Sequence, residues 1–293
     1  MTRPRFVVAG VPKAGTTSLY HYLAAQEGVY VSDLKEINFL SYPGADVARE
    51  RYPWLEFPVT TIEAYEALFA PSGDRVPIDF SPSCFRSHVA VDRMREFVPD
   101  AGVLLVLRDP VSRAWSAYQN RVRKGYERRA PDDALVPGER AVDMGFYAGR
   151  VEELQRAFGR DRVGVWLFDD LSNDAEATVR SILHHVGATG AEDARVEDRK
   201  HNVAHVPRSR ALHRLFPDHA RRRAVLARVP RAALRPLEWI YNANQRAGDR
   251  IPDATAARLR ALYAGDVRRL EILLQRDLTD WLPVAGAERI GPH

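Results

Sequence analysis

The chain has 293 residues, of which 45% are hydrophobic and 28% charged, and its formal net charge at pH 7 is +4. This length suits one large α/β domain or two small ones. No run of about 18 apolar residues occurs, which excludes a readable membrane span. The first apolar run is too short for a signal peptide, and a single cysteine, Cys84, excludes an internal disulfide. We therefore expect a cytoplasmic enzyme.

Strands and helices alternate along much of the chain. Short apolar runs predict strands over residues 5–10, 75–79, 102–107 and 163–168. Apolar residues at helical spacing predict helices over residues 16–26, 62–69, 86–98, 110–124, 146–158 and 175–186. Irregular loops are predicted over residues 28–61 and 125–144, and further helices at about 208–216, 218–228, 231–247 and 254–276. This order predicts an α/β fold with a mostly parallel central sheet flanked by helices, and a helical C-terminal portion. We interpret residues 1–293 as one domain, with the helical portion covering about 205–293.

The segment GVPKAGTT, residues 10–17, lies between the first predicted strand and the first predicted helix. A glycine loop in this context directs backbone N–H groups and a helix N-terminus at an anion. The two glycines have the spacing of a nucleotide-kinase loop, but Thr16 occupies the lysine position and the lysine stands earlier, at Lys13. We predict that a phosphate-like group binds at Lys13, Ala14, Gly15, Thr16, Thr17 and Ser18.

A second motif, LRDPVSRAWSAY, covers residues 107–118 and follows the clearest buried strand. A kinase holds Mg²⁺ with a carboxylate at the end of a neighbouring strand. This strand instead ends in Arg108, which repels a metal ion and attracts an anion. Arg108 and Ser116 are placed to meet one phosphate, and Asp79 is the carboxylate left to hold Mg²⁺. These residues favour an anionic ligand without a metal, and a magnesium-dependent small-molecule kinase using Asp79 is the alternative.

Eleven Lys and Arg residues occur between residues 199 and 235, with Asp218 as the one acidic residue. Solvated helix faces account for most such cations. A non-catalytic polyanion-binding protein, which would bind heparin or RNA through these arginines, is a further alternative. No ladder of aromatic residues accompanies the arginines, so we expect no nucleic-acid partner.

Together, the two motifs resemble those of the sulfotransferases that use PAPS (3′-phosphoadenosine 5′-phosphosulfate), most of all the heparan-sulfate-sulfotransferase-like branch with its bacterial members. Four more segments resemble that branch in the same order: KEINFL (35–40), IDFSPSCF (78–85), GFYAGRVEEL (145–154) and LRALYAGDVRRLEILLQRDLTDWL (259–282). The resemblance implies a P-loop-type three-layer α/β fold. It also implies sulfuryl transfer from PAPS to an acceptor hydroxyl, with release of PAP and without a metal.

The same resemblance implies roles for single residues. The loop would hold the 5′-phosphosulfate of PAPS, Lys13 would stabilise the bridging oxygen, and Arg108 and Ser116 would hold the 3′-phosphate. Glu36 would be the general base, which needs burial or a charged partner to serve near pH 7. Further candidates are Arg208 and Arg210 for the 3′-phosphate, and Lys35, Asn38, Asp79 and Ser81 for the acceptor.

Two positions depart from the branch, since Asn38 replaces a histidine and Phe80 replaces a lysine. Both positions contact saccharide or support the base in the enzymes it resembles, so a heparan-like acceptor does not follow. We expect a small-molecule or glycan acceptor, a carbohydrate or a secondary metabolite, in a pocket shaped by residues 39–58 and 125–144. His88 is an alternative base, because cytosolic sulfotransferases use a histidine, but its place at a predicted helix start favours a structural role.

Overall fold

The computed structural model describes residues 2–52, 55–196, 205–207, 245–247 and 249–283. The chain divides into two compact units. The first unit comprises Met1–Arg108, Tyr147–His201 and Arg268–Asp277, and the second comprises Asp109–Phe146, Asn202–Val267 and Leu278–His293. The chain passes repeatedly between the units, so the interpretation of residues 1–293 as one domain stays a prediction.

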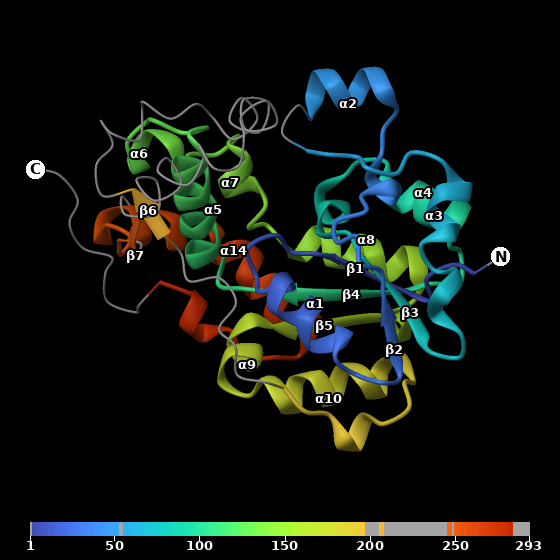
Figure 1. Cartoon of the computed structure of the whole chain (residues 1–293). Coiled ribbons are helices and arrows are strands. Elements are labelled where there is room, and N and C mark those ends of the chain that lie inside the picture. The colour runs from blue at the N-terminus through green and yellow to red at the C-terminus, as the bar shows by residue number, and fades with distance from the viewer. Residues whose placement is uncertain (1, 53–54, 197–204, 208–244, 248, 284–293) are drawn as a thin grey trace, which may run out of the picture. The chain divides into compact units, whose positions relative to one another are not determined.

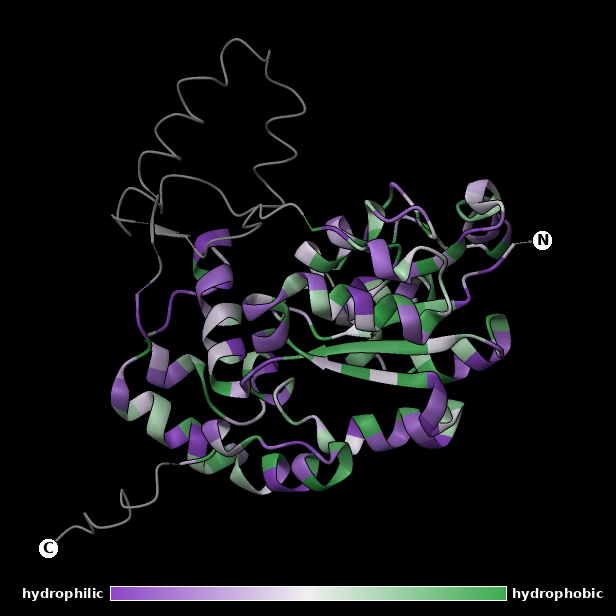
Figure 2. Cartoon of the chain, turned by 90° about the horizontal axis from the view of Figure 1, so that it is seen from below, coloured by the Kyte–Doolittle hydropathy of each residue, from purple (hydrophilic) through white to green (hydrophobic). Residues whose placement is uncertain are grey.

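A parallel sheet forms the centre of the first unit. Its strands, in spatial order, are β2 (Val29–Val31), β3 (Val76–Phe80), β1 (Phe6–Gly10), β4 (Gly102–Leu107) and β5 (Val163–Leu167). Every residue of β3 and β4 is buried, as expected for parallel strands that are covered on both faces. Much of the sheet appears in the green of hydrophobic residues in Figure 2.

Helices cover both faces of this sheet. On one face lie α1 (Thr16–Ala24) and α10 (Ala175–Val186), and on the other α4 (Ala90–Phe97) and α8 (Ala148–Phe158) (Figure 1). Further helices of this unit are α2 (Ala45–Arg51), α3 (Ile62–Ala67) and α9 (Phe168–Asn173). Short 3₁₀ turns cover Phe39–Ser41, Ala70–Ser72, Pro82–Arg86, Arg160–Arg162 and Ala191–Asp193. The predicted α/β fold, with a parallel sheet between helices, is confirmed.

The second unit is mainly helical where it is described. It contains α5 (Pro110–Lys124), α6 (Pro131–Ala134), α7 (Arg140–Asp143), a 3₁₀ turn (Thr279–Trp281) and an antiparallel pair of strands, β6 (His205–Pro207) and β7 (Gln245–Ala247). The carboxylate of Asp109 caps α5 by accepting the N–H groups of Val111 and Ser112 at 3.2 Å each. Helix α14 (Asp253–Leu274) contributes residues to both units. No helix in the described ranges is long and apolar enough to cross a membrane.

Three predicted segments differ from the observed elements. The irregular segment 28–61 contains β2 and α2, and the loop 125–144 contains α6 and α7. The helix predicted over residues 231–247 is wrong at its end, because residues 245–247 pair with residues 205–207 as strands. Such pairing overrides the local helical spacing. The helices predicted at 208–216 and 218–228 lie outside the described residues.

Candidate active site

The GVPKAGTT segment forms a loop between the end of β1 and the start of α1. Gly15 precedes α1 in a left-handed conformation, with φ 82°. The helix opens with a hydrogen bond from the N–H of Leu19 to the carbonyl of Gly15, at 3.0 Å. Because the first N–H groups of a helix have no acceptor within it, this geometry directs a helix N-terminus at an anion.

Arg108, at the end of β4, is fixed against this loop. Its Nη1 donates a hydrogen bond to the carbonyl oxygen of Lys13 at 3.1 Å. Its guanidinium lies over the ring of Phe168, 4.4 Å from the ring centroid. The hydroxyl of Tyr147 donates to the carbonyl of Arg108 at 2.8 Å. The loop and the arginine of the second motif, far apart in the sequence, therefore meet in the first unit.

Lys35 joins the loop to the predicted base. Its Nζ donates to Oγ1 of Thr17 at 2.5 Å and lies 3.9 Å from Oε1 of Glu36. Burial lowers the pKa of Lys35, and the neighbouring Glu36 carboxylate opposes that effect. The side chain of Glu36 is 56% exposed, so the carboxylate is open to an incoming molecule. Of the two alternatives expected for the base, burial or a charged partner, the candidate has the charged partner.

The end of β3 holds the segment that carries Glu36. The N–H of Glu36 donates to the carbonyl of Phe80 at 3.0 Å, and the N–H of Asn38 donates to the hydroxyl of Ser81 at 3.1 Å. Both Glu36 and Asn38 have a φ of 58°, in the left-handed region that is uncommon for residues other than glycine. These bonds therefore fix the backbone position from which the Glu36 side chain extends.

Asp79 and Ser81 do not lie where the acceptor prediction requires them. Each is 0% exposed, and Asp79 accepts hydrogen bonds from the hydroxyls of Tyr65 at 2.8 Å and Ser81 at 2.7 Å. Neither side chain has exposed surface in this arrangement, so direct acceptor contact by Asp79 or Ser81 is not supported and stays a prediction. Both carboxylate oxygens of Asp79 are engaged, which also weakens its case as a Mg²⁺ ligand. Within the described part of the chain, no group of three or more His, Cys, Asp or Glu side chains is arranged to hold a metal ion.

Asn38 is also part of the framework and is only 2% exposed. Its Nδ2 donates to the carbonyl of Glu56 at 2.8 Å, and its Oδ1 accepts from the hydroxyl of Ser83 at 2.6 Å. The first bond ties the Glu36 segment to Glu56, and the second ties it to the 3₁₀ turn Pro82–Arg86. Direct acceptor contact by Asn38 is therefore not supported, and Lys35 is the acceptor candidate that keeps exposed surface, 21% of its side chain.

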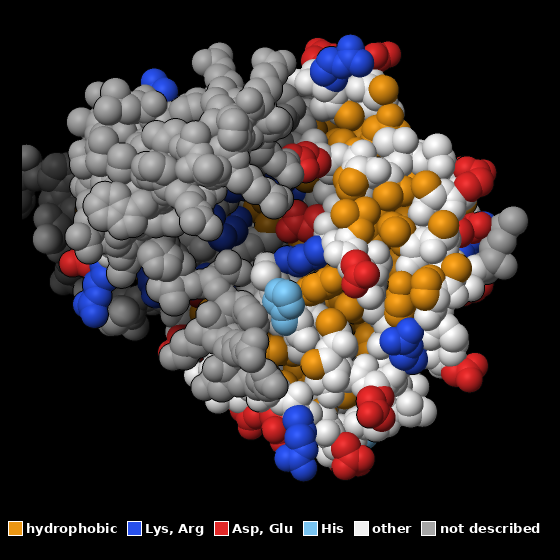
Figure 3. Space-filling view, viewed as in Figure 1, with side chains coloured by type: hydrophobic (Ala, Val, Ile, Leu, Met, Phe, Trp, Pro, Cys, Tyr) orange, Lys and Arg blue, Asp and Glu red, His pale blue; other side chains and the backbone are white. Residues whose placement is uncertain are grey.

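Aromatic side chains gather within the predicted acceptor segment, residues 39–58. The rings of Tyr42 and Phe57 are partly exposed, with centroids 5.3 Å apart. Figure 3 shows apolar side chains on the surface below α2, in the same part of the first unit. The alternative base, His88, is exposed, and its Nδ1 lies 3.0 Å from the hydroxyl of Tyr52. The rings of Tyr42 and Phe57 offer an apolar surface, and Tyr42 follows the base candidate Glu36 by six residues in the sequence.

The remaining candidates are not joined to this site by described contacts. Ser116 lies on α5 in the second unit and is partly exposed. Arg208 and Arg210 lie outside the described residues, as do almost all of residues 199–235, on which the polyanion alternative depends. Their roles stay predictions.

Two residues of the site are missing from the sequence-based candidates, Phe168 and Tyr147. Phe168 directly follows β5, and side chains at the carboxyl ends of parallel strands form the sites of open α/β sheets, so its position was a usable signal. Tyr147 belongs to the segment GFYAGRVEEL, but nothing in the sequence shows that it bonds to Arg108.

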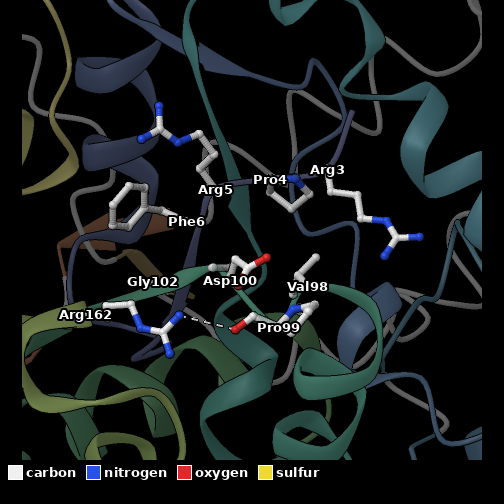
Figure 4. Close-up of a pocket in the computed structure, with 10 residues that line it drawn as sticks. Arg3, Pro4, Arg5, Phe6, Val98, Pro99, Asp100, Gly102 and Arg162 are labelled. Carbon is white, nitrogen blue, oxygen red and sulfur yellow. Dashed lines mark hydrogen bonds between the residues drawn. The ribbon is translucent and has the colours of Figure 1, made fainter. Parts of the chain in front are cut away.

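A cavity of about 480 Å³ lies at the opposite end of the sheet. It is lined by residues 3–6, 98–102 and 162, and Arg162 donates to the carbonyl of Pro99 at 3.3 Å (Figure 4). These residues lie at the amino ends of β1 and β4, whereas Gly10 and Arg108 lie at the carboxyl ends. The cavity is therefore separate from the candidate site.

Comparisons with known proteins show the family and the fold of this chain. The family model "Sulfotransferase domain" matches residues 3–213. The bifunctional heparan sulfate N-deacetylase/N-sulfotransferase 4 of Mus musculus is 25% identical over 212 residues, 64% of this chain and 22% of that protein. The corresponding Drosophila melanogaster protein is 28% identical over 132 residues, 42% of this chain and 12% of that protein. The chain thus spans less than a quarter of the length of these relatives. The crystal structure of a sulfotransferase from Alicyclobacillus acidocaldarius matches 96% of this chain and 99% of its own, with a TM-score of 0.67 and 26% identity.

Proposed function

This chain belongs to the sulfotransferase family, and we propose that it transfers the sulfuryl group of PAPS to a hydroxyl of a carbohydrate or secondary-metabolite acceptor. The observation that carries the proposal is the position of Lys35. Its ammonium contacts Thr17 of the loop and Glu36 of the base segment, at 2.5 Å and 3.9 Å. One cation, Lys35, thus contacts both the proposed anion-binding loop and the candidate base.

The residues of the first unit suit a donor with two separate anionic groups, such as PAPS with its 5′-phosphosulfate and its 3′-phosphate. The N-terminus of α1 directly follows the loop. Lys13 belongs to the GVPKAGTT segment, and Lys35 and Arg108 each donate a hydrogen bond to it. Arg108 is oriented by Phe168 and by its bond to the loop, and such fixed donors lose little freedom when an anion binds. The resemblance assigns the 3′-phosphate to Arg108 and Ser116, with Arg208 and Arg210 as further candidates, and this assignment is part of the proposal.

We assign the chemical steps to three residues. The acceptor oxygen bonds to sulfur while the bond between sulfur and the bridging oxygen of the donor breaks, so that PAP leaves. Glu36 takes the proton of the acceptor hydroxyl, and general-base assistance of this kind typically contributes about 10²–10⁴-fold. Lys13 and the N–H groups of the loop stabilise the charge that develops on the bridging oxygen, each donor contributing about 2.7–4 kcal/mol in the transition state. Lys35, whose Nζ lies 3.9 Å from Oε1 of Glu36, orients the Glu36 carboxylate.

Three observations bear on the acceptor class: the names of the relatives, two departures from the branch, and the aromatic rings of residues 39–58. The curated relatives are named for N-sulfotransfer on heparan sulfate, which points to a glycan. Asn38 and Phe80 depart from the branch, and the partly exposed rings of Tyr42 and Phe57 would suit the apolar face of a sugar or the ring of a secondary metabolite. We therefore propose a ring-bearing alcohol that need not be heparan-like.

An acceptor panel with radiolabelled PAPS tests this function. Monosaccharides, phenols and an amino sugar are offered separately, with EDTA present throughout. We expect label on a hydroxyl acceptor and stoichiometric PAP. Label confined to the nitrogen of the amino sugar would replace the acceptor hydroxyl by an amine. A separate reaction with labelled ATP and Mg²⁺, without EDTA, tests the kinase alternative, against which the engaged oxygens of Asp79 already argue. Transfer in that reaction, with none from PAPS, would favour the kinase.

A further inference from the structure

Asp79 is a carboxylate in the middle of an apolar sheet, and the proposed reaction gives it no direct task. All five residues of β3 are buried, and Asp79 is 0% exposed. Burial raises the pKa of Asp79 to about 6, although the hydrogen bonds from Ser81 and Tyr65 lower it. Burying a carboxylate costs folding free energy unless its oxygens accept hydrogen bonds. The donors of those bonds therefore show which parts of the fold depend on Asp79.

Ser81 connects Asp79 to the segment that carries the base. A serine hydroxyl has one proton to donate and two lone pairs with which to accept. Ser81 donates that proton to Oδ1 of Asp79 at 2.7 Å, and its oxygen accepts the N–H of Asn38 at 3.1 Å. Asp79 therefore orients the hydroxyl so that its lone pairs face the backbone of Asn38.

The base segment needs this support because its backbone conformation is uncommon. Glu36 and Asn38 both have a φ of 58°. Outside glycine, such a conformation persists only where the surroundings hold it in place. The end of β3 supplies two bonds to the segment, from the N–H of Glu36 to the carbonyl of Phe80 and from the N–H of Asn38 to Ser81. One of these two bonds depends on Asp79.

We propose that Asp79 is a positioning residue for sulfuryl transfer, which holds Glu36 in place through the Ser81 hydroxyl and the backbone of Asn38. This inference rests on the proposed role of Glu36 as the base. It assigns different tasks to the two partners of Asp79. Ser81 transmits the effect, whereas Tyr65, which donates to Oδ2 at 2.8 Å and packs against Phe69, anchors the carboxylate in the core.

A matched pair of variants separates these tasks. Ser81→Ala and Tyr65→Phe each remove one hydroxyl that donates to Asp79, and both side chains are fully buried. Only Ser81→Ala breaks the bond to the Glu36 segment. Three properties are measured on the full chain: amide hydrogen exchange at Glu36 and Asn38, calorimetric affinity for PAP, and turnover. Turnover is followed as PAP release from PAPS, with water as the acceptor.

We expect Ser81→Ala to speed exchange at Asn38 and to lower turnover about 10- to 100-fold, the usual cost of a small misplacement of a catalytic group. Its affinity for PAP stays unchanged, because the phosphate loop is untouched. Tyr65→Phe keeps both turnover and exchange at Asn38 close to those of the unaltered chain. Asp79→Leu reproduces the losses of Ser81→Ala, and the double variant adds no further loss, since both act through one bond.

The inference is overturned if Tyr65→Phe lowers turnover as much as Ser81→Ala, because Asp79 would then serve the core alone. It is also overturned if Ser81→Ala leaves exchange and turnover unchanged, or if the losses of Asp79→Leu and Ser81→Ala add. Failure of the proposed base looks different. In that case Glu36→Gln keeps full turnover, while Ser81→Ala still speeds exchange at Asn38.

Discussion

The Glu36 carboxylate is held by its backbone and by one cation, while 56% of the side chain remains exposed. The backbone of Glu36 is left-handed, with a φ of 58°, and the exposed part of its side chain can meet an acceptor. We predict that Glu36→Gln lowers PAP release about 10²–10⁴-fold, the range of a lost general base, and leaves PAP affinity unchanged. Steady-state turnover and calorimetry measure the two effects. Glu63→Gln, which removes an exposed carboxylate on α3, is the control and should alter neither.

Lys35 gives the reaction an alkaline limit. Burial lowers the pKa of Lys35 from its usual 10.5, so the ammonium loses its proton at a lower pH than an exposed lysine does. Above that pH, Thr17 and Glu36 lose their cationic partner. We predict that turnover falls at a pH below that at which an ordinary lysine loses its proton, and that Lys35→Arg moves this fall to higher pH, because a guanidinium stays charged. A profile of turnover against pH that is the same for both proteins would contradict this role.

At the scale of single elements, the sequence predicts the parts whose signals are local. The strand of residues 102–107 and the helix of residues 110–124 match β4 and α5 residue for residue, because an unbroken apolar run and a proline at the helix start mark them. β2 has three residues, and α6 and α7 have four each, too few to show a period. β7 depends on its pairing with β6, which no local pattern shows.

The site residues also fall into those that the sequence predicts and those that it does not. Lys13 and Arg108 are predicted from the glycine loop and from the end of a buried strand, whereas Glu36 is predicted only from the resemblance of its segment to a known family. The buried position of Asp79 is not readable, because a polar residue near the end of a strand normally indicates exposed surface. Its burial depends on Tyr65, a residue of α3 that reaches it across the fold.

The junction of β1, the loop and α1 depends on Gly15. Its φ is 82°, and an added Cβ atom would lie 2.8 Å from Phe168 Cδ2. We predict that Gly15→Ala destabilises the protein by about 1–3 kcal/mol, the cost of a side chain in that conformation, and weakens PAP binding. Gly149→Ala in α8 is the matched control, since no atom lies within 4 Å of an added Cβ there. It should be neutral or stabilise the helix by up to about 1 kcal/mol. Urea unfolding measures both, and equal effects would contradict the account.

At the scale of the whole molecule, the order of the strands creates the candidate site. β1 lies between β3 and β4, and the three strands run parallel, so their carboxyl ends share one edge. This order brings the loop after β1 beside Arg108 after β4, and brings the end of β3 beside the Glu36 segment. Two motifs about 95 residues apart in the chain become neighbours because they follow adjacent parallel strands. Ligand sites of such sheets form at this edge.

Calorimetric titration with PAP in the presence of EDTA tests the central claim most directly. The claim is that the loop and its cations bind a phosphorylated adenosine carrier without a divalent metal. We predict micromolar or tighter binding by the unaltered chain, which corresponds to about −8 kcal/mol, and a loss of at least about tenfold in Lys13→Ala, the equivalent of 1.4 kcal/mol. No binding in EDTA, or equal binding by Lys13→Ala, would contradict the account.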